Sequence, residues 1–394
     1  MALVNMRDLL NHAYQNQYAV GAFDLVSLDF LEAVIAAAEE SRAAVILSLA
    51  EPHFEYYDVA LMLPAVEAAA QRATVPVAIQ LDHGSSLASA EQAIGMGCNG
   101  VMVDASSQPL PDNIRTTREV VEMAHQCGVA VVGELGYVAG VEGEGAEIHP
   151  GESSYTSVAE AKGYLERTGV DFMAVSVGTV QGHVKGRAKL DIRRLKELNQ
   201  ALQIPLEVHG GSGLNEEQFH KLTSNGVAKI NYYTALSDVA AAAMRSSSKE
   251  NPKGSFLDLK RDVKDAVQQE VQRCLRLWGS AGRAAEILEQ CATWNSADEL
   301  ILFNLESEDG LEIEQMCAEG KRLFEGMAGV RRFNISAQPS SERRGYRFCC
   351  QIRFASAEAL DHCKQRDDYR ALVVRKWGQR IEDSIQGSYQ LMGG

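Results

Sequence analysis

The chain has 394 residues, of which 46% are apolar and 23% charged, a composition typical of globular proteins. It carries 38 Lys and Arg against 53 Asp and Glu, and this net charge of −15 argues against nucleic acid and anionic membranes as partners. No apolar run reaches the roughly 18 residues that a membrane helix needs, and the first residues lack the features of a signal peptide. Eight scattered cysteines without a CxxC pair predict reduced thiols and a cytoplasmic location.

After an amphipathic helix at the start of the chain, short apolar runs alternate with amphipathic helical segments. Eight runs are predicted as strands: 18–23, 44–49, 77–81, 100–103, 129–135, 172–177, 205–209 and 228–232. Predicted helices between them include 27–41, 60–72, 112–127, 157–168 and 215–225. Nearly continuous apolar strands are typical of a parallel sheet covered on both faces. Eight such units predict a closed (β/α)8 TIM barrel, with an open doubly wound sheet as the alternative.

The pattern changes near residue 290. A helix over 257–278 is followed by a predicted linker over 286–297. The later elements are predicted as strand 300–305, helix 311–327, strands 331–337 and 346–354, helix 357–379 and strand 384–391. This βαββαβ order is ferredoxin-like. The sequence therefore predicts a barrel domain over 1–285 and a small α+β domain over 298–394.

Polar residues gather where the predicted barrel strands end, which is where barrel enzymes place their functional groups. These residues are Asp82 and His83, Asp104, Glu134, His209, and Asn231 with Thr234. Imidazole and carboxylate groups together suit zinc and similar divalent ions, so the set predicts a metal site. The alternative is that each histidine caps a strand or helix on its own.

Two glycine-rich turns are candidates for phosphate binding. His209-Gly-Gly-Ser-Gly precedes a predicted helix, whose first backbone N–H groups could bind an anion, and the second turn holds Gly182 and Lys185. Tight turns are also needed in any barrel, so the alternative is a purely structural role. The loop 136–145 has four glycines and carries Glu142, which is consistent with a mobile lid bearing a base or with a solvated acidic loop.

Six motifs together resemble the class II (metal-dependent) ketose-bisphosphate aldolase family, which includes fructose- and tagatose-bisphosphate aldolases. They are YAVGAF at 18–23, QLDHG at 80–84, GELG at 133–136, GTVQGHVKG at 178–186, VHGGSG at 208–213 and GVAKIN at 226–231. The resemblance covers roughly residues 1–285. It implies an enzyme that reversibly cleaves a phosphorylated ketose into dihydroxyacetone phosphate, or a similar ketone, and an aldehyde.

The resemblance also implies roles for individual residues. A divalent metal, usually Zn2+, would polarise the substrate carbonyl, and a monovalent cation (Na+ or K+) would lie near the phosphate. Asp82 is implied as the acid or base at the substrate hydroxyl and Glu142 as the base at carbon. The implied metal-site positions are His83, His209, Gln181, His183 and Glu134. The implied substrate and phosphate positions are Gly182, Lys185, Gly210, Ser212, Asn231 and Thr234.

This chain departs from the family at several positions. Gln181 stands where the family has its third histidine ligand, and His183 could replace that ligand. Three further departures, Asp24, Ala50 and Tyr233, weaken the fit to the usual phosphorylated ketose, and a fourth, Gly254, argues against a bisphosphate in particular. One alternative function is a catalytically impaired barrel that binds a sugar phosphate as a regulatory or structural subunit. Another is related enolate chemistry on a non-phosphorylated substrate.

The segment 51–58 also departs from the family. We interpret its His53 and Glu55 as surface residues, with recognition of a different substrate as the alternative. Residues from about 298 to 390 resemble the dimeric α/β-barrel domains, through Gly329-Val330 and FCCQIRFASAEALDHC at 348–363. Because those domains pair their sheets, this resemblance implies a homodimer or homotetramer.

Overall fold

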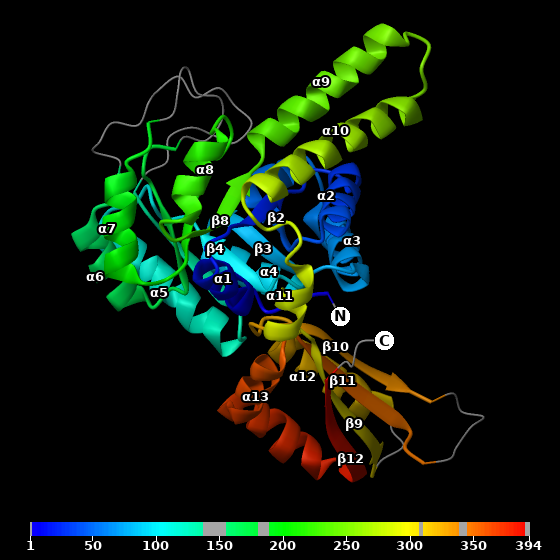
Figure 1. Cartoon of the computed structure of the whole chain (residues 1–394). Helices are drawn as coiled ribbons and strands as arrows, with labels where there is room; N and C mark the ends of the chain where they lie inside the picture. Colours follow the sequence, from blue (N-terminus) through cyan, green and yellow to red (C-terminus); the bar gives the residue numbers. More distant parts are fainter. Residues whose placement is uncertain (1, 137–154, 180–188, 307–309, 339–344, 391–394) are drawn as a thin grey trace.

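The computed structural model describes residues 2–136, 155–179, 189–306, 310–338 and 345–390 (Figure 1). Eight parallel strands follow one another in chain order, and β1 pairs with β8 to close the barrel. The strands are β1 (Val20–Asp24), β2 (Val45–Ala50), β3 (Val77–Gly84), β4 (Gly100–Val103), β5 (Ala130–Leu135), β6 (Phe172–Val175), β7 (Leu206–Val208) and β8 (Val227–Tyr232). The closed barrel confirms the predicted TIM fold and excludes the open sheet.

Helices surround the barrel, and two of them extend away from it. They are α1 (Met6–Gln15), α2 (Leu28–Ser41), α3 (Val59–Arg72), α4 (Leu87–Met96), α5 (Leu110–Gln126), α6 (Val158–Thr168), α7 (Ile192–Leu202), α8 (Glu216–Thr223), α9 (Thr234–Glu250), α10 (Phe256–Leu277) and α11 (Ala284–Gln290), with a short 3-10 turn η1 (Glu51–Glu55). Helices α9 and α10 lie side by side as an arm that projects from the barrel (Figure 1).

The barrel interior is apolar at one end and polar at the other. Small and branched side chains such as Ala22, Ile46 and Ala78 fill the lower interior, and Met6 and Leu10 of α1 pack against them as a floor. Nearer the carboxyl ends of the strands, the inward positions become polar. The buried polar residues there include Asp24, Ser48, Gln80, Asp82, Glu134, Glu207, His209 and Asn231. The functional groups therefore lie above an apolar floor that excludes water from below.

Gly100, at the start of β4, allows the floor helix to approach the strand closely. A Cβ added at this position would overlap Met6 Sδ, which is fully buried. We therefore expect Gly100→Ala to lower the free energy of unfolding by about 1 to 3 kcal/mol, measured by urea denaturation, because a packed core resists an added methyl group. Gly326→Ala is the matched control, since a Cβ there meets nothing within 4 Å. Equal effects of the two substitutions would contradict this account.

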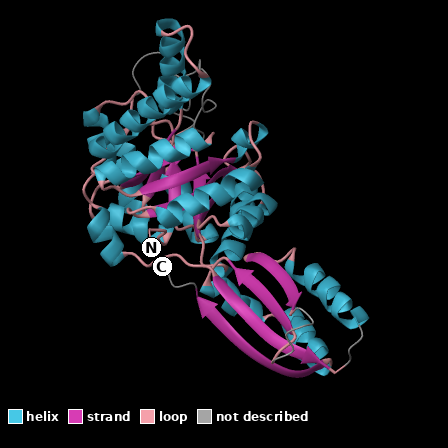
Figure 2. Ribbon diagram, turned by 90° about the vertical axis from the view of Figure 1, so that its right-hand side faces the viewer, coloured by secondary structure: helices cyan, strands magenta, loops and turns pink. Residues whose placement is uncertain are grey.

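The C-terminal part forms a four-stranded antiparallel sheet in the order β10-β11-β9-β12. Its elements are β9 (Ala297–Leu305), α12 (Gly310–Phe324), β10 (Val330–Ala337), β11 (Phe348–Phe354), α13 (Ala357–Gln365) and β12 (Ile381–Gln390). Helices cover one face of the sheet (Figure 2). The other face exposes Leu302, Ile385 and Tyr389, the last two at 56%. The predicted βαββαβ order is confirmed.

The predicted single helix over 357–379 is wrong, because it breaks at Arg366. The backbone of Arg366 is extended, and its side chain pairs with Asp368 at 2.6 Å. Asp368 Oδ1 also accepts a hydrogen bond from the backbone N of Tyr369. Three short helical turns follow: α14 (Asp367–Tyr369), η3 (Arg370–Lys376) and η4 (Trp377–Gln379). Aspartate favours the start of a helix over its interior, and two successive aspartates explain the break.

The C-terminal sheet is attached to the barrel at the end opposite the polar mouth. Arg331 at the start of β10 forms a two-point ion pair with Glu67 of α3, at 2.7 Å for each contact. It also donates to the carbonyl of Met96 at the end of α4, while Ser356 donates to the carbonyl of Cys127 just after α5. The barrel helices run antiparallel to the strands, so their last residues lie at the floor end.

Loss of Arg331 is expected to weaken this attachment. Its side chain is 15% exposed and that of Glu67 18%, so Arg331→Ala leaves a partly buried carboxylate without its partner. We expect a loss of about 1 to 3 kcal/mol in the free energy of unfolding of the C-terminal part, together with faster proteolysis there. Arg332→Ala is the matched control because Arg332 is exposed. If both variants resist protease equally, the ion pair does not secure the sheet.

Candidate metal and phosphate site

Three strands bring the central side chains together at the mouth of the barrel. Asp82 and His83 lie at the carboxyl end of β3, His209 follows β7, and Asn231 lies on β8. One ligand atom from each of Asp82, His83 and His209 lies within 4.8 Å of the others. The His83 and His209 rings are 4.6 Å apart between centroids. The structure thus brings together residues that are far apart in the sequence.

The backbone and one carboxylate fix the orientation of His83. Its φ of 46° lies in the left-handed region, which is uncommon for a residue with a side chain. Its Nδ1 lies 3.0 Å from Asp104 Oδ2. A carboxylate only accepts, so Nδ1 donates and Nε2 carries the lone pair. Nε2 in turn lies 4.0 Å from Asp82 Oδ2.

Asp104, directly after β4, is one of the strand-end residues predicted for the metal site, but the family resemblance assigned it no individual role. Burial alone would raise its pKa, but the hydrogen bonds from His83 and Ser106 outweigh burial and hold the pKa well below its usual range. Asp104 therefore stays charged beside His83. Its place at a strand end was visible in the sequence, but its partner was not.

His209 is fully buried among polar partners. Its Nδ1 is 3.2 Å from Asn231 Nδ2, and the same amide nitrogen donates to Asp82 Oδ2 at 2.6 Å. Its Nε2 lies 3.2 Å from Glu207 Oε1. Burial would lower the pKa of His209, but contact with Glu207 outweighs burial and raises the pKa.

The donor set fits a divalent metal. Two imidazoles and one carboxylate converge, and a second group joins His83 to Asp104 and Glu134. This mixture of nitrogen and oxygen ligands is typical of zinc and related ions. Burial raises the pKa of Glu134 to about 7, and a bound cation would favour its charged form. Five predicted site positions lie outside the described residues: Glu142, Gln181, Gly182, His183 and Lys185.

Three of the predicted phosphate positions, Gly210, Ser212 and Thr234, lie near the start of α9. The backbone N of Ala235, in the first turn of α9, donates to Ser212 Oγ at 3.1 Å. Gly210, with φ 71°, begins the turn that carries Ser212, and Thr234 is the first residue of α9. A glycine-rich turn beside a helix N-terminus offers backbone N–H groups to an anion. This arrangement is suited to a phosphate.

The structure corrects the interpretation of His53 as a surface residue. Its side chain is 7% exposed, and its ring lies 4.5 Å from that of Tyr233, centroid to centroid. The short turn η1 directs His53 inward, toward the start of α9. Glu55 is exposed, as predicted. The sequence did not indicate this burial because the partner ring is 180 residues away in the chain.

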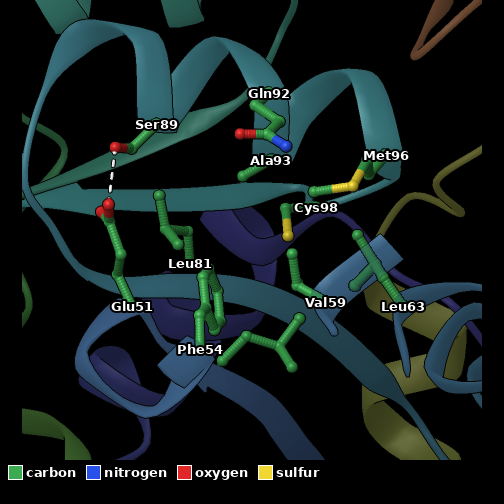
Figure 3. Close-up of a pocket in the computed structure, with 11 residues that line it drawn as sticks. Glu51, Phe54, Val59, Leu63, Leu81, Ser89, Gln92, Ala93, Met96 and Cys98 are labelled. Carbon is green, nitrogen blue, oxygen red and sulfur yellow. Dashed lines mark hydrogen bonds between the residues drawn. The ribbon is translucent and has the colours of Figure 1, made fainter. Parts of the chain in front are cut away.

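A small cavity lies outside the barrel wall and does not belong to the site. Its volume is about 40 Å³, enough for water but not for a sugar. The cavity is lined by Leu49, Leu81, Phe54 and Cys98, among others (Figure 3). Leu49 and Leu81 belong to barrel strands and point away from the barrel interior. Glu51 at its edge accepts a hydrogen bond from Ser89.

Among the described helices, none is long and apolar enough to cross a membrane.

The barrel part of the chain is similar in sequence and in structure to known proteins. The family described as "Fructose-bisphosphate aldolase class-II" matches residues 4–283. The fructose-bisphosphate aldolase of Geobacillus stearothermophilus is 36% identical over 296 residues, covering 73% of this chain and 100% of that protein. The enzyme of that name from Thermus caldophilus is 37% identical over 307 residues, covering 72% and 100%. The crystal structure of the YdjI aldolase from Escherichia coli K12 aligns with a TM-score of 0.65 at 33% identity, covering 72% of this chain and 99% of that one.

Proposed function

Since the chain belongs to the class II fructose-bisphosphate aldolase family, we propose that its barrel mouth cleaves a phosphorylated ketose between two carbons, reversibly. Membership makes the chain a carbon–carbon lyase of a metal-dependent class. The single observation that carries the proposal is the arrangement around Asp82. Two imidazoles face this buried carboxylate, and each has a second carboxylate at its other ring nitrogen.

The proposed roles follow from what each side chain can do. Asp82, held by the amide of Asn231, takes the proton from the substrate hydroxyl during cleavage and returns it in the reverse reaction. His83, with Nε2 unprotonated, and His209 would hold the metal, with Glu134 as a further candidate ligand grouped with His83. A Zn2+ ion there would supply the Lewis acid that polarises the ketone carbonyl. Products are dihydroxyacetone phosphate, or a similar ketone, and an aldehyde.

The remaining roles rest on the family resemblance alone. They are the carbon base Glu142, the third metal ligand Gln181 or His183, the phosphate contacts Gly182 and Lys185, and a monovalent cation near the phosphate. For Gly210, Ser212 and Thr234, the turn beside α9 supports phosphate binding. The alternative of an impaired regulatory barrel gains no support from the described residues, since the central groups converge.

The experiment that tests this proposal combines metal content with activity. After dialysis against dilute zinc and then metal-free buffer, the full chain is expected to retain about one equivalent of metal. It is expected to cleave at least one compound in a panel of ketose phosphates, with the ketone phosphate product detected by a coupled reductase. Chelation should remove the activity and zinc should restore it. Full cleavage by chelated protein, or no cleavage of any panel member by the metal-loaded protein, would overturn the proposal.

We also propose an assembly and a location. The chain would divide into a barrel domain over 1–285, a linker over 286–297 and a ferredoxin-like domain over 298–394. The exposed apolar residues Leu302, Ile385 and Tyr389 lie on the uncovered face of the C-terminal sheet and support pairing of two copies. Light scattering should give a dimer or tetramer, and Ile385→Lys should shift it toward monomer. The eight cysteines are free, which supports a cytoplasmic location.

A further inference from the structure

Two opposite charges lie inside the barrel directly behind His209, and the proposed function uses neither. Glu207 on β7 is fully buried and Lys229 on β8 is 1% exposed. Lys229 Nζ lies 2.8 Å from Glu207 Oε1, and the same oxygen lies 3.2 Å from His209 Nε2. A buried charge is costly unless it is paired. The pair is therefore a specific feature of this interior, built around one imidazole.

A local irregularity of β8 brings Lys229 to Glu207. Leu206 pairs with Val227, but the next residue, Glu207, pairs with Lys229 and not with Ala228. This extra residue is a β-bulge, which changes the direction of the side chains beyond it. Val227 packs in the outer core and Ala228 in the inner one. Without the bulge, strict alternation would turn Lys229 outward, so the bulge allows the contact.

The neighbouring hydrogen bonds determine which nitrogen of His209 carries the proton. Asp82 is an acceptor, so the Asn231 atom 2.6 Å from it is the amide nitrogen. The same nitrogen, a donor, lies 3.2 Å from His209 Nδ1, which must therefore accept. A neutral imidazole has one N–H, so the proton is on Nε2, the ring nitrogen that lies 3.2 Å from Glu207 Oε1. In the metal-bound protein the lone pair of Nδ1 would coordinate the ion instead of accepting from Asn231, on the side where Asp82 lies.

We propose that Glu207 is a positioning residue that keeps His209 in the tautomer with Nδ1 turned to the metal, and that Lys229 is its counter-charge. This inference rests on the proposed function for the presence of the metal. Asp104 does the same for His83 through the opposite ring nitrogen. Carboxylates behind metal-bound histidines fix the ring and increase its basicity, and their loss weakens metal binding by roughly 10 to 100-fold.

The first test determines the tautomer of His209 in the metal-free full chain by long-range 1H–15N correlation NMR of labelled histidine. The His209 signals are assigned by their absence in His209→Gln. The wild type is expected to give the Nε2-protonated pattern. Glu207→Met with Lys229→Met removes both charges at similar volume, a replacement that folded proteins often accept. This double variant keeps the Asn231 donor at Nδ1 but loses the carboxylate at Nε2, so it is expected to give more of the Nδ1-protonated form than the wild type. An Nδ1-protonated His209 in the wild type would overturn the proposal.

The second test measures zinc affinity by competition with a chelator, with thermal unfolding as a check on folding. The double variant is expected to bind roughly 10 to 100-fold more weakly. Glu207→Gln with Lys229→Met keeps an oxygen that can accept from Nε2 and should restore most of the affinity. Glu299→Gln is the control, since Glu299 is a buried carboxylate paired with Lys364 in the C-terminal sheet. Equal affinity in the wild type and the double variant would overturn the role of Glu207. A wild type that binds no zinc would instead overturn the metal in the proposed function, while the tautomer test still decides the position of the proton.

Discussion

His209→Ala is expected to remove metal binding and to lower kcat for ketose phosphate cleavage by about 1,000-fold or more. The substitution deletes a fully buried imidazole, the proposed metal ligand, whose ligand atom lies within 4.8 Å of those of Asp82 and His83. A bound metal contributes several kcal/mol of transition-state stabilisation, and each 1.36 kcal/mol corresponds to tenfold in rate. Elemental analysis and steady-state kinetics on the same preparation measure the two effects.

His220→Ala provides the comparison for His209→Ala, because His220 is exposed on α8. It should retain both metal and kcat. Normal metal content in His209→Ala would show that the metal is held elsewhere. Loss of metal without loss of rate would show that cleavage does not depend on it.

Asp82→Asn is expected to lower kcat by about 100 to 10,000-fold while metal content and KM change little. The amide keeps the size of the side chain but cannot take the hydroxyl proton. Its neighbour Asn231 would lose the 2.6 Å hydrogen bond to a carboxylate oxygen, so a modest loss of stability is expected as well. Two measurements on zinc-loaded protein separate these effects. The kcat value reports proton transfer, and the midpoint of thermal unfolding reports the loss of stability.

A carboxylate with only a structural role serves as the control for Asp82. Asp298, 7% exposed in the C-terminal sheet and paired with Arg353, should tolerate replacement by Asn with unchanged kcat. An Asp82→Asn variant with kcat near the wild-type value would remove Asp82 from the proton transfer. The metal could then keep its role, with a different group as base.

Much of the barrel could be predicted because each strand is encoded by its own apolar run. The run 100–103 coincides with β4, and 172–177 contains β6. The predicted resemblance to class II aldolases is confirmed by the family match over residues 4–283. The order of elements in the C-terminal sheet also follows from local periodicity. The break at Arg366 is missed because the helical periodicity continues across it, although Asp367 and Asp368 favour the start of a new helix there.

The candidate site could be predicted only as far as the strand ends. Asp82, His83, His209 and Asn231 come together as expected, although their roles remain predictions. Glu207 is concealed within an otherwise apolar run, and a hydrogen-bond register between two strands brings Lys229 to it. Alternation along a single strand does not encode that register. The contact between Glu207 and Lys229 is therefore seen only in the three-dimensional structure.

The first residues of the chain connect parts that are made at very different times. Leu3 forms an isolated β-bridge with Val77 of the barrel strand β3. The carbonyl of Leu3 accepts a hydrogen bond from the backbone N of Trp294, and Val4 forms a β-bridge with Thr293. A ribosome adds about 5 to 20 residues per second, so about 15 to 60 s separate the synthesis of Leu3 from that of Trp294. Once Val77 has been made, the start of the chain has one of its two neighbours and lacks the other. The floor of the barrel can therefore be completed only after all eight strands have been made, although its sequence emerges first.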